Sequence, residues 1–102
     1  MPWVQVLGGA IPDAIPQASY DLVVASEILY YLEPDDLAAT LSRLRDCLAP
    51  HGRLVAVHWR PSGQERPFTA AEVHGLLRRQ GWLSSVRCAP TDDYLLDVLE
   101  RR

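Results

Sequence analysis

Two segments that are rich in apolar residues end in side chains that can do chemistry. Ser26 and Glu27 follow the run LVVA, and His58 and Trp59 end the run LVAVHW. A carboxylate at Glu27 could orient a bound amine or accept a proton from it, as a general base does. The structural alternatives are that Glu27 caps a strand end or pairs with an arginine, and that His58 and Trp59 are satisfied in the core.

Other residue types that carry chemistry form no site by their spacing. Three histidines without paired spacing predict no metal site. We expect His51 to be solvated in a turn and His74 to pack beside an apolar stripe. The chain has no lysine, which excludes a lysine nucleophile, and it has no G-x-S-x-G elbow. Cys47 and Cys88 lie far apart without a C-x-x-C motif, which favours free thiols in a reducing cytoplasm.

Length and charge limit the classes of partner. The chain of 102 residues has the size of one small domain, and its 48% hydrophobic and 23% charged residues are typical of a globular protein. A net charge of -3 argues against binding to a nucleic-acid backbone, which needs a basic face. No apolar run approaches the ~20 residues that span a bilayer, and we expect no leader sequence and no membrane partner.

The order of apolar runs and breaking residues predicts a single α/β domain over residues 1–102. Strands are expected at 3–7, 22–26, 53–59, 83–89 and 94–99, and helices at 34–48 and 70–80. The two strands before and after the first helix have continuous apolar centres, which is typical of parallel strands with both faces covered. They predict a parallel βαβ unit, and the last two strands predict an antiparallel hairpin.

Both predicted helices carry start and stop signals. Pro34 suits a first helical position, and Pro50 and Gly52 are expected to end the first helix. Thr69 and Glu72 have the spacing of a capping box at the start of the second helix. The core face of the first helix is a stripe of four leucines, namely Leu37, Leu41, Leu44 and Leu48.

Two stretches resemble a known family. YDLVVASEILYYL (residues 20–32) resembles the fourth-strand motif of class I methyltransferases that use S-adenosylmethionine. LAPHGRL (residues 48–54) resembles the L-x-P-G-G-x-L turn that leads into their fifth strand. Within that superfamily, SEILYYL together with HWR is most similar to nodulation-type N-methyltransferases. The resemblance implies a partial Rossmann-like methyltransferase sheet that lacks the family's first two strands.

The resemblance also implies roles for residues near the carboxyl ends of the strands, where open α/β sheets bind ligands. Ser26 and Glu27 would line the methionine end of the cofactor, with Glu27 as the catalytic residue. The expected adenine contacts are Gly9, Ala10 and Ile11. The expected substrate contacts are Tyr30, Tyr31, His58 and Trp59.

Adjacent residues in this set cannot all face one pocket. Side chains alternate along a strand, so His58 and Trp59 are expected to point to opposite faces of the sheet. An aromatic ring can contact a cationic sulfonium, which suits Tyr30 and Tyr31 to the pocket. The alternative is that one of these tyrosines packs in the core while the other lies on the surface.

Two cofactor-binding elements of the family are missing from the sequence. These are the glycine-rich turn after the first strand and the acidic residue that holds the ribose; Gly9 also stands where the family has an aspartate near adenine. We therefore expect a methyltransferase fragment for a small-molecule amine that is inactive alone. Two alternatives stay open: a non-catalytic module that dimerises or binds a partner, and one half of a split methyltransferase.

The missing strands have a consequence for association. In the family the first strand lies beside the fourth, so the strand at 22–26 would have an open edge. An apolar strand with unpaired backbone groups on its edge is an association site. We expect this edge to pair with a second copy of the chain or with the missing N-terminal half.

Overall fold

The computed structural model describes residues 11–61 and 66–102. The strand expected at 3–7, like Gly9 and Ala10, lies outside the described residues. The observed elements are β1 (Tyr20–Ser26), the 3₁₀ turn η1 (Leu29–Tyr31), α1 (Pro34–Cys47), β2 (Leu48–Trp59), α2 (Ala70–Arg78), β3 (Leu83–Cys88) and β4 (Tyr94–Arg101).

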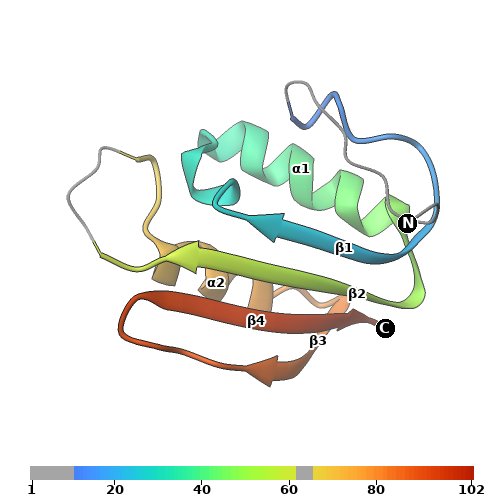
Figure 1. The fold of residues 1–102 in the computed structure, drawn as a ribbon. Coiled ribbons are helices and arrows are strands. Elements are labelled where there is room, and N and C mark those ends of the chain that lie inside the picture. The colour runs from blue at the N-terminus through green and yellow to red at the C-terminus, as the bar shows by residue number, and fades with distance from the viewer. Residues whose placement is uncertain (1–10, 62–65) are drawn as a thin grey trace, which may run out of the picture.

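The described strands form one mixed sheet in the order β1-β2-β4-β3 (Figure 1). β1 and β2 are parallel and are joined through α1, which confirms the βαβ unit. β3 and β4 form the antiparallel hairpin, and β4 also pairs antiparallel with β2. The carboxyl ends of β1 and β2 therefore lie side by side at one edge of the sheet.

Local signals in the sequence account for both helices. Pro34 occupies the first turn of α1, and the predicted leucine stripe is buried. At the start of α2 the Glu72 amide donates to Thr69 Oγ1 at 3.1 Å, and the Thr69 amide donates to Glu72 Oε1 at 3.0 Å. The capping box is confirmed. α2 ends at Arg78, two residues before the expected end, because the helix tightens there: the Gln80 amide donates to the carbonyl of Leu77, three residues back instead of four.

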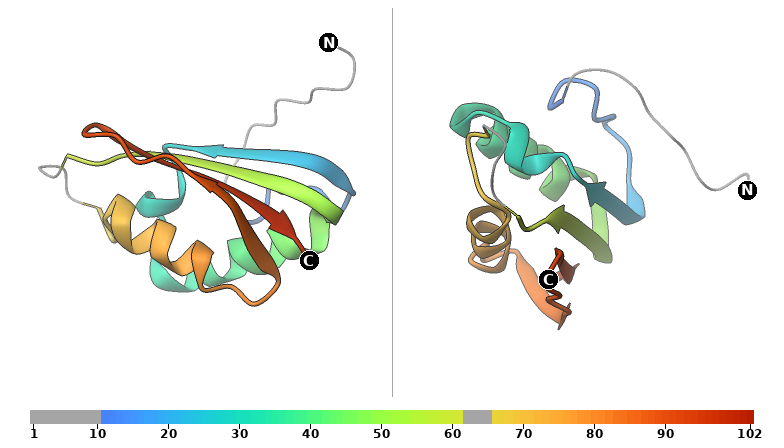
Figure 2. Two further views of the ribbon diagram at one scale, coloured as in Figure 1. Left: turned by 90° about the horizontal axis from the view of Figure 1, so that it is seen from below. Right: turned by 60° about the vertical axis from the view of Figure 1, so that its left-hand side comes forward.

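Both helices lie on the same face of the sheet (Figure 2). The core is formed where α1 and α2 meet the inward side chains of the central strands, which include Leu54, Ala56 and Leu99. Burial on this face follows the two-residue period of a strand and the apolar stripe of each helix. The helices thus fix the inward face, and the ends of β1 and β2 remain open to solvent.

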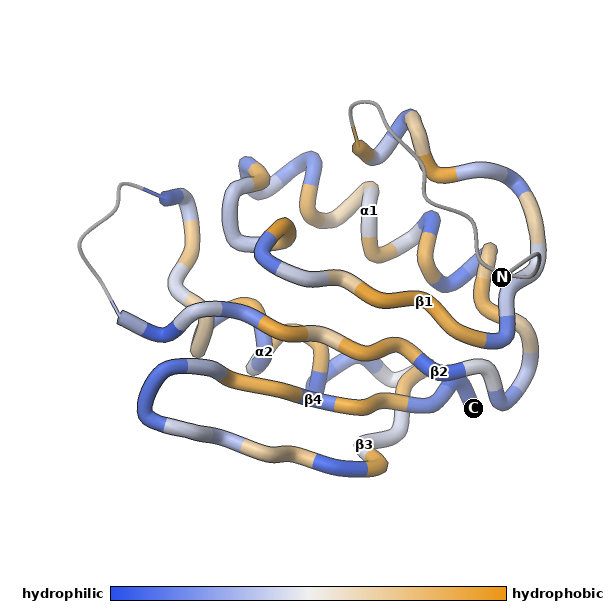
Figure 3. The backbone as a smooth tube through the Cα atoms, viewed as in Figure 1, coloured by the Kyte–Doolittle hydropathy of each residue, from blue (hydrophilic) through white to orange (hydrophobic). Residues whose placement is uncertain are grey.

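The opposite face of the sheet corrects the expectation that β1 is covered on both sides. Within the described residues Leu22 and Val24 are 58% and 59% exposed, whereas Ala25, which points to the helices, is buried. Figure 3 shows that hydrophobic residues nevertheless run along both β1 and β2. The apolar run was typical of a strand buried on both sides, but its outer face carries no helix in the described part of the chain.

The segment between α1 and the centre of β2 also differs from the expectation. The helix ends at Cys47, and residues 48–52 continue as the start of β2 instead of forming a separate turn. The pairing shifts there, because Tyr20 lies opposite Leu48 while Leu22 lies opposite Arg53. The extra residues on β2 are accommodated as an irregularity in which His51, at φ 64°, adopts the left-handed conformation that glycine favours.

Gly52→Ala is expected to lower the free energy of unfolding by about 1–3 kcal/mol, the usual cost of overpacking. A Cβ at Gly52 would lie 2.8 Å from the carbonyl oxygen of Ala49 and 3.0 Å from that of Tyr20, and neither backbone atom can rotate aside. Gly81→Ala is the matched control, because its Cβ would meet nothing within 4 Å. Urea denaturation compares the two variants, and equal losses of stability would contradict the close approach.

Candidate functional site

The turn that follows β1 is held against the end of β2. The Glu27 amide donates to the carbonyl of Val57 at 2.9 Å, which extends the parallel pairing by one residue. The carboxylate then reaches across the strand ends, and Glu27 Oε1 accepts from the amide of Trp59 at 2.6 Å. Glu27 has φ 57°, a backbone conformation that costs free energy for a residue other than glycine. Its contacts fix the carboxylate at the carboxyl edge of the sheet.

The two tyrosines of the turn have different surroundings. Tyr30 is fully buried, and its hydroxyl donates to Glu27 Oε2. The guanidinium of Arg66 lies 4.0 Å from the centre of the Tyr30 ring, a cation–π contact. Tyr31 is 50% exposed and meets Tyr30 edge to face, with ring centres 4.8 Å apart. The Tyr30 ring thus lies in the core next to Glu27, and the Tyr31 ring lies at the surface against Tyr30.

His58 and Trp59 point to opposite faces of β2, as alternation requires. His58 is fully buried on the helix side, where its ring contacts Tyr30 at 4.7 Å between centres. Trp59 is 37% exposed on the other side and stacks edge to face on Tyr94. Of these two candidates, only the tryptophan presents its side chain to solvent in this structure.

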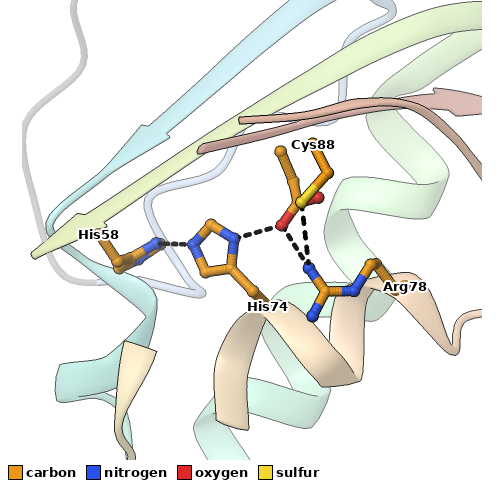
Figure 4. A network of polar contacts seen from close by, with 5 residues as sticks. His58, His74, Arg78 and Cys88 are labelled. Atoms are coloured by element: carbon orange, nitrogen blue, oxygen red, sulfur yellow. Dashed lines mark hydrogen bonds and ion pairs between the residues drawn. The ribbon is translucent and has the colours of Figure 1, made fainter. Parts of the chain in front are cut away.

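A polar network that the sequence did not reveal continues from His58 (Figure 4). His58 Nδ1 lies 2.9 Å from His74 Nε2, and His74 Nδ1 lies 2.6 Å from Asp97 Oδ2. Arg78 donates to the same carboxylate oxygen at 2.8 Å. His74 was expected only to pack, and Asp97 was not singled out. The available signal was a charged residue at an inward position of an otherwise apolar strand, YLLDVLE.

Burial keeps both histidines neutral near physiological pH. Desolvation, together with the neighbouring His74 and Arg66, lowers the pKa of His58 from its usual 6.5 to about 4. Desolvation also lowers the pKa of His74, although the hydrogen bond to Asp97 opposes that shift. Neither ring therefore carries a charge that would need a further partner.

Protein stability is expected to fall as the pH drops from about 6.5 to about 4. In that window the unfolded chain binds a proton at His58 while the folded chain does not, so acid favours the unfolded state. A pKa that is lower in the folded state by this amount corresponds to roughly 3 kcal/mol. Urea denaturation across the window measures the slope, and His58→Gln should flatten it. An unchanged slope in that variant would contradict the assignment.

The remaining predicted cofactor contacts are placed apart or outside the described residues. Ser26 ends β1 beside Glu27, and its side chain is exposed. Ile11 belongs to a turn leading to Ile15, whose carbonyl accepts from Arg43 near the end of α1. α1 ends at Cys47, and the next residue, Leu48, lies opposite Tyr20 at the start of β1. The structure therefore anchors the Ile11 segment at the other end of β1 from Glu27.

Two surface grooves lie away from these residues. One, of about 450 Å³, runs between α1 and α2 and includes Leu37 and Leu76. The other, of about 510 Å³, lies between the end of α1 and residues 16–19. Within residues 11–61 and 66–102, no group of three or more histidine, cysteine or acidic residues could hold a metal ion. The same residues include no helix with the length and apolar character needed to cross a membrane.

Comparison with known proteins identifies the fold. The chain is similar to a protein from Pseudomonas syringae assigned as a methyltransferase, at 32% sequence identity and a TM-score of 0.70. The match covers 84% of this chain and 50% of that protein. The fold is that of part of a methyltransferase. This confirms the partial Rossmann-like sheet that the sequence motifs implied.

Two further methyltransferase structures share this fold. The N-methyltransferase NodS from Bradyrhizobium japonicum, in complex with S-adenosyl-L-homocysteine, is 24% identical with a TM-score of 0.66. A 1,6-didemethyltoxoflavin-N1-methyltransferase from Burkholderia thailandensis is 22% identical with a TM-score of 0.65. Each match covers 84% of this chain, and 48% and 45% of the respective structures. The chain thus spans about half the length of these methyltransferases. No protein-family model and no curated protein matches the sequence.

Proposed function

We propose that the chain is part of an S-adenosylmethionine-dependent methyltransferase that methylates nitrogen in a small molecule, and that it is inactive alone. The observation that carries the proposal is the match of 84% of the chain to half of a methyltransferase at 32% identity. Support for nitrogen as the acceptor comes from the likeness to NodS and from a carboxylate fixed at the strand edge. Both cysteines are free, which suits a cytoplasmic location.

Glu27 is the residue proposed to act on the acceptor. It lies beyond the carboxyl ends of two parallel strands, the place where open α/β sheets bind ligands. Each of its oxygens accepts one hydrogen bond, from the Trp59 amide and the Tyr30 hydroxyl, and a carboxylate has lone pairs for more. It can therefore stay oriented while it accepts a hydrogen bond or a proton from an amine.

The described residues fit only one side of a cofactor site. S-adenosylmethionine supplies an electrophilic methyl group on a sulfonium. Glu27 suits an amine next to that group, and the exposed rings of Tyr31 and Trp59 suit a cation or an aromatic acceptor. The sequence has no glycine-rich turn after a strand and no acidic residue placed for the ribose. The nucleoside would have to be held by residues beyond those described.

The same reasoning divides the predicted substrate contacts into two groups. Tyr31 and Trp59 are exposed enough to line an acceptor pocket. Tyr30 and His58 are buried against each other, so their proposed part is to support the turn. Ser26 is exposed beside Glu27 and remains a candidate cofactor contact. The roles of Gly9, Ala10 and Ile11 remain predictions from the resemblance.

We also propose that the rest of a methyltransferase sheet, on the same or another polypeptide, covers β1. Among the described residues β1 pairs only with β2, and its outer face exposes Leu22 and Val24. The continuous apolar run of β1 is typical of a parallel strand that is covered on both faces, and this chain spans about half of the methyltransferases that it matches. Sedimentation of the chain alone should show a monomer at micromolar concentration. A stable dimer would assign the surface to a second copy.

The same exposed face favours a second candidate function, a non-catalytic module that binds a partner through β1. Leu22 and Val24 would be buried in such a complex without any cofactor. The two functions differ in whether the completed sheet binds S-adenosyl-L-homocysteine, the compound held by NodS.

A fusion protein tests the proposed enzyme directly. The half of the Pseudomonas syringae protein that this chain does not match is joined ahead of the present chain, and calorimetry measures binding of S-adenosyl-L-homocysteine. We expect micromolar binding by the fusion and none by either half alone. A fusion that unfolds cooperatively but does not bind would favour the non-catalytic module. Micromolar binding by the present chain alone would contradict the proposal that it lacks part of the site.

A further inference from the structure

One buried hydrogen-bond chain connects the candidate site to the far side of the core. It starts at the backbone amide of Leu29, which lies 3.2 Å from His58 Nε2, and continues through His74 to Asp97. All three of these side chains are fully buried. Figure 4 shows the rings from β2 and α2 in line, with Arg78 at the end of the chain.

The backbone amide sets the direction of every bond in this chain. An amide can only donate, so His58 Nε2 must accept from Leu29 and carry no proton. The neutral ring then has its proton on Nδ1 and donates it to His74 Nε2. His74 in turn carries its proton on Nδ1 and donates to the carboxylate of Asp97. This arrangement of protons satisfies the Leu29 amide and both rings, and both histidines are neutral in it; His74 and Arg78 share one Asp97 oxygen, and Asp97 Oδ1 accepts no hydrogen bond.

The surroundings of the rings maintain this proton arrangement. His58 on β2 faces the Tyr30 ring from η1, His74 from α2 and the positive charge of Arg66. His74 faces Asp97 from β4 and the positive charge of Arg78 on its own helix. Desolvation lowers the pKa of both rings, and a cation near each ring adds to the shift. A second proton on His58 would have to sit on Nε2, where it would face the N–H of the Leu29 amide and leave that donor without an acceptor.

The anchored amide belongs to the turn that carries Glu27. One end of that turn is fixed by the bonds from Glu27 to Val57 and Trp59, at the edge of the sheet. The bond from Leu29 to His58 fixes the turn two residues later, on the helix side. Glu27, at the first of these points, has a left-handed backbone conformation. A strained residue persists only where the surrounding structure holds it in place.

We propose that His58, His74 and Asp97 are positioning residues, whose directional hydrogen bonds set the conformation of residues 27–31 and so the aim of the Glu27 carboxylate. The catalytic meaning of that aim rests on the proposed function. The hydrogen-bond network does not rest on the proposed function, and it can be measured in the isolated polypeptide.

Two substitutions at His58 distinguish the hydrogen bond at Nε2, to Leu29, from the one at Nδ1, to His74. Glutamine can place an oxygen near the position of Nε2 and accept from Leu29, whereas asparagine reaches only the position of Nδ1. Hydrogen exchange at the Leu29 amide is the readout, with His51→Gln, at an exposed site, as the control. We expect protection close to wild type in His58→Gln and a loss of at least about tenfold in His58→Asn, because a local bond has been opened.

Nitrogen-15 NMR of the unsubstituted chain provides a measurement that needs no variant. We expect His58 protonated on Nδ1 alone and His74 protonated on Nδ1 alone at neutral pH. In the fusion protein, His58→Asn should lower kcat with little change in KM, and His58→Gln should restore it. A proton on Nε2 of His58, or equal Leu29 exchange in the two variants, would overturn the proposal. If both histidines are protonated on Nδ1 but the fusion does not bind S-adenosyl-L-homocysteine, the hydrogen-bond network is supported and only the proposed methyltransferase function is rejected.

Discussion

Replacing Asp97 with alanine is expected to lower the free energy of unfolding by about 2–4 kcal/mol. The carboxylate is fully buried and one of its oxygens accepts from both His74 and Arg78. Hydrogen bonds to a charged group are worth more than neutral ones, and a buried donor left without an acceptor pays its full desolvation cost. For a domain of this size the loss is a large fraction of the total stability.

The two partners of Asp97 contribute unequally to that loss. The side chain of Arg78 is 39% exposed and can turn to water when the carboxylate is removed. His74 is fully buried, and its Nδ1 proton has no other acceptor among the described residues. Most of the cost therefore comes from the histidine end of the pair.

Thermal and urea denaturation of Asp97→Ala measure this effect against two other variants. Asp92→Ala removes an exposed aspartate from the turn between β3 and β4 and should change stability by less than about 0.5 kcal/mol. Asp97→Asn keeps an oxygen that can accept from His74 and should fall between the two. If Asp97→Ala were as stable as Asp92→Ala, the buried network would not stabilise the fold.

The second large effect is expected on activity. In the fusion protein, Glu27→Gln should lower kcat by a factor of about 10² to 10⁴, the usual contribution of a general base. Glutamine keeps the size of the side chain, and its oxygen can still accept from the Trp59 amide, so the turn should keep its shape. What is lost is the negative charge and the ability to accept a proton from the attacking amine.

Steady-state methyl transfer to an amine acceptor provides the measurement for this variant. The matched control is Glu33→Gln, because Glu33 is an exposed glutamate before α1 whose side chain makes no capping hydrogen bond. The control should keep the activity of the parent fusion. A Glu27→Gln protein that is folded, binds S-adenosyl-L-homocysteine and turns over at the parent rate would show that Glu27 only caps the strand end.

Several elements were predictable because their causes are local. The capping box of Thr69 and Glu72 needs only four consecutive residues, and the helix from Pro34 follows from a proline and a leucine stripe. The βαβ unit follows from two apolar runs separated by a helix. For the two helices the signal lies within the helix that it produces, and the βαβ unit joins elements that follow one another directly in the sequence.

The candidate site was only partly predictable, because its contacts join distant segments. The placement of Glu27 at the strand edge followed from the order of strands, but its bond to Trp59 depends on how β1 and β2 align. The network from His58 to Asp97 joins residues from β2, α2 and β4. No spacing along the sequence encodes that meeting, and an aspartate inside an apolar strand was the one local sign of it.

Coverage of the sheet was mispredicted for a physical reason. An apolar run records what a strand contacts in its complete setting, and in the described residues β1 lacks one neighbour and one layer of helices. The sequence of β1 is suited to a strand buried on both faces, but in this structure Leu22 and Val24 on its outer face are exposed. The mismatch is what points to a covering segment.

Amide hydrogen exchange along β1 tests the central claim that this strand belongs inside a larger methyltransferase sheet. The Glu27 amide points to β2, so by alternation the amides of Val23 and Ala25 also point to β2, while those of Val24 and Ser26 point to the open edge. In the chain alone, the first pair should be protected and the second pair should exchange rapidly. In the fusion protein all four should be protected. The account would be contradicted if, in the monomeric chain, the amides of Val24 and Ser26 were as well protected as those of Val23 and Ala25. Rapid exchange at Val24 and Ser26 in a folded fusion would also contradict it.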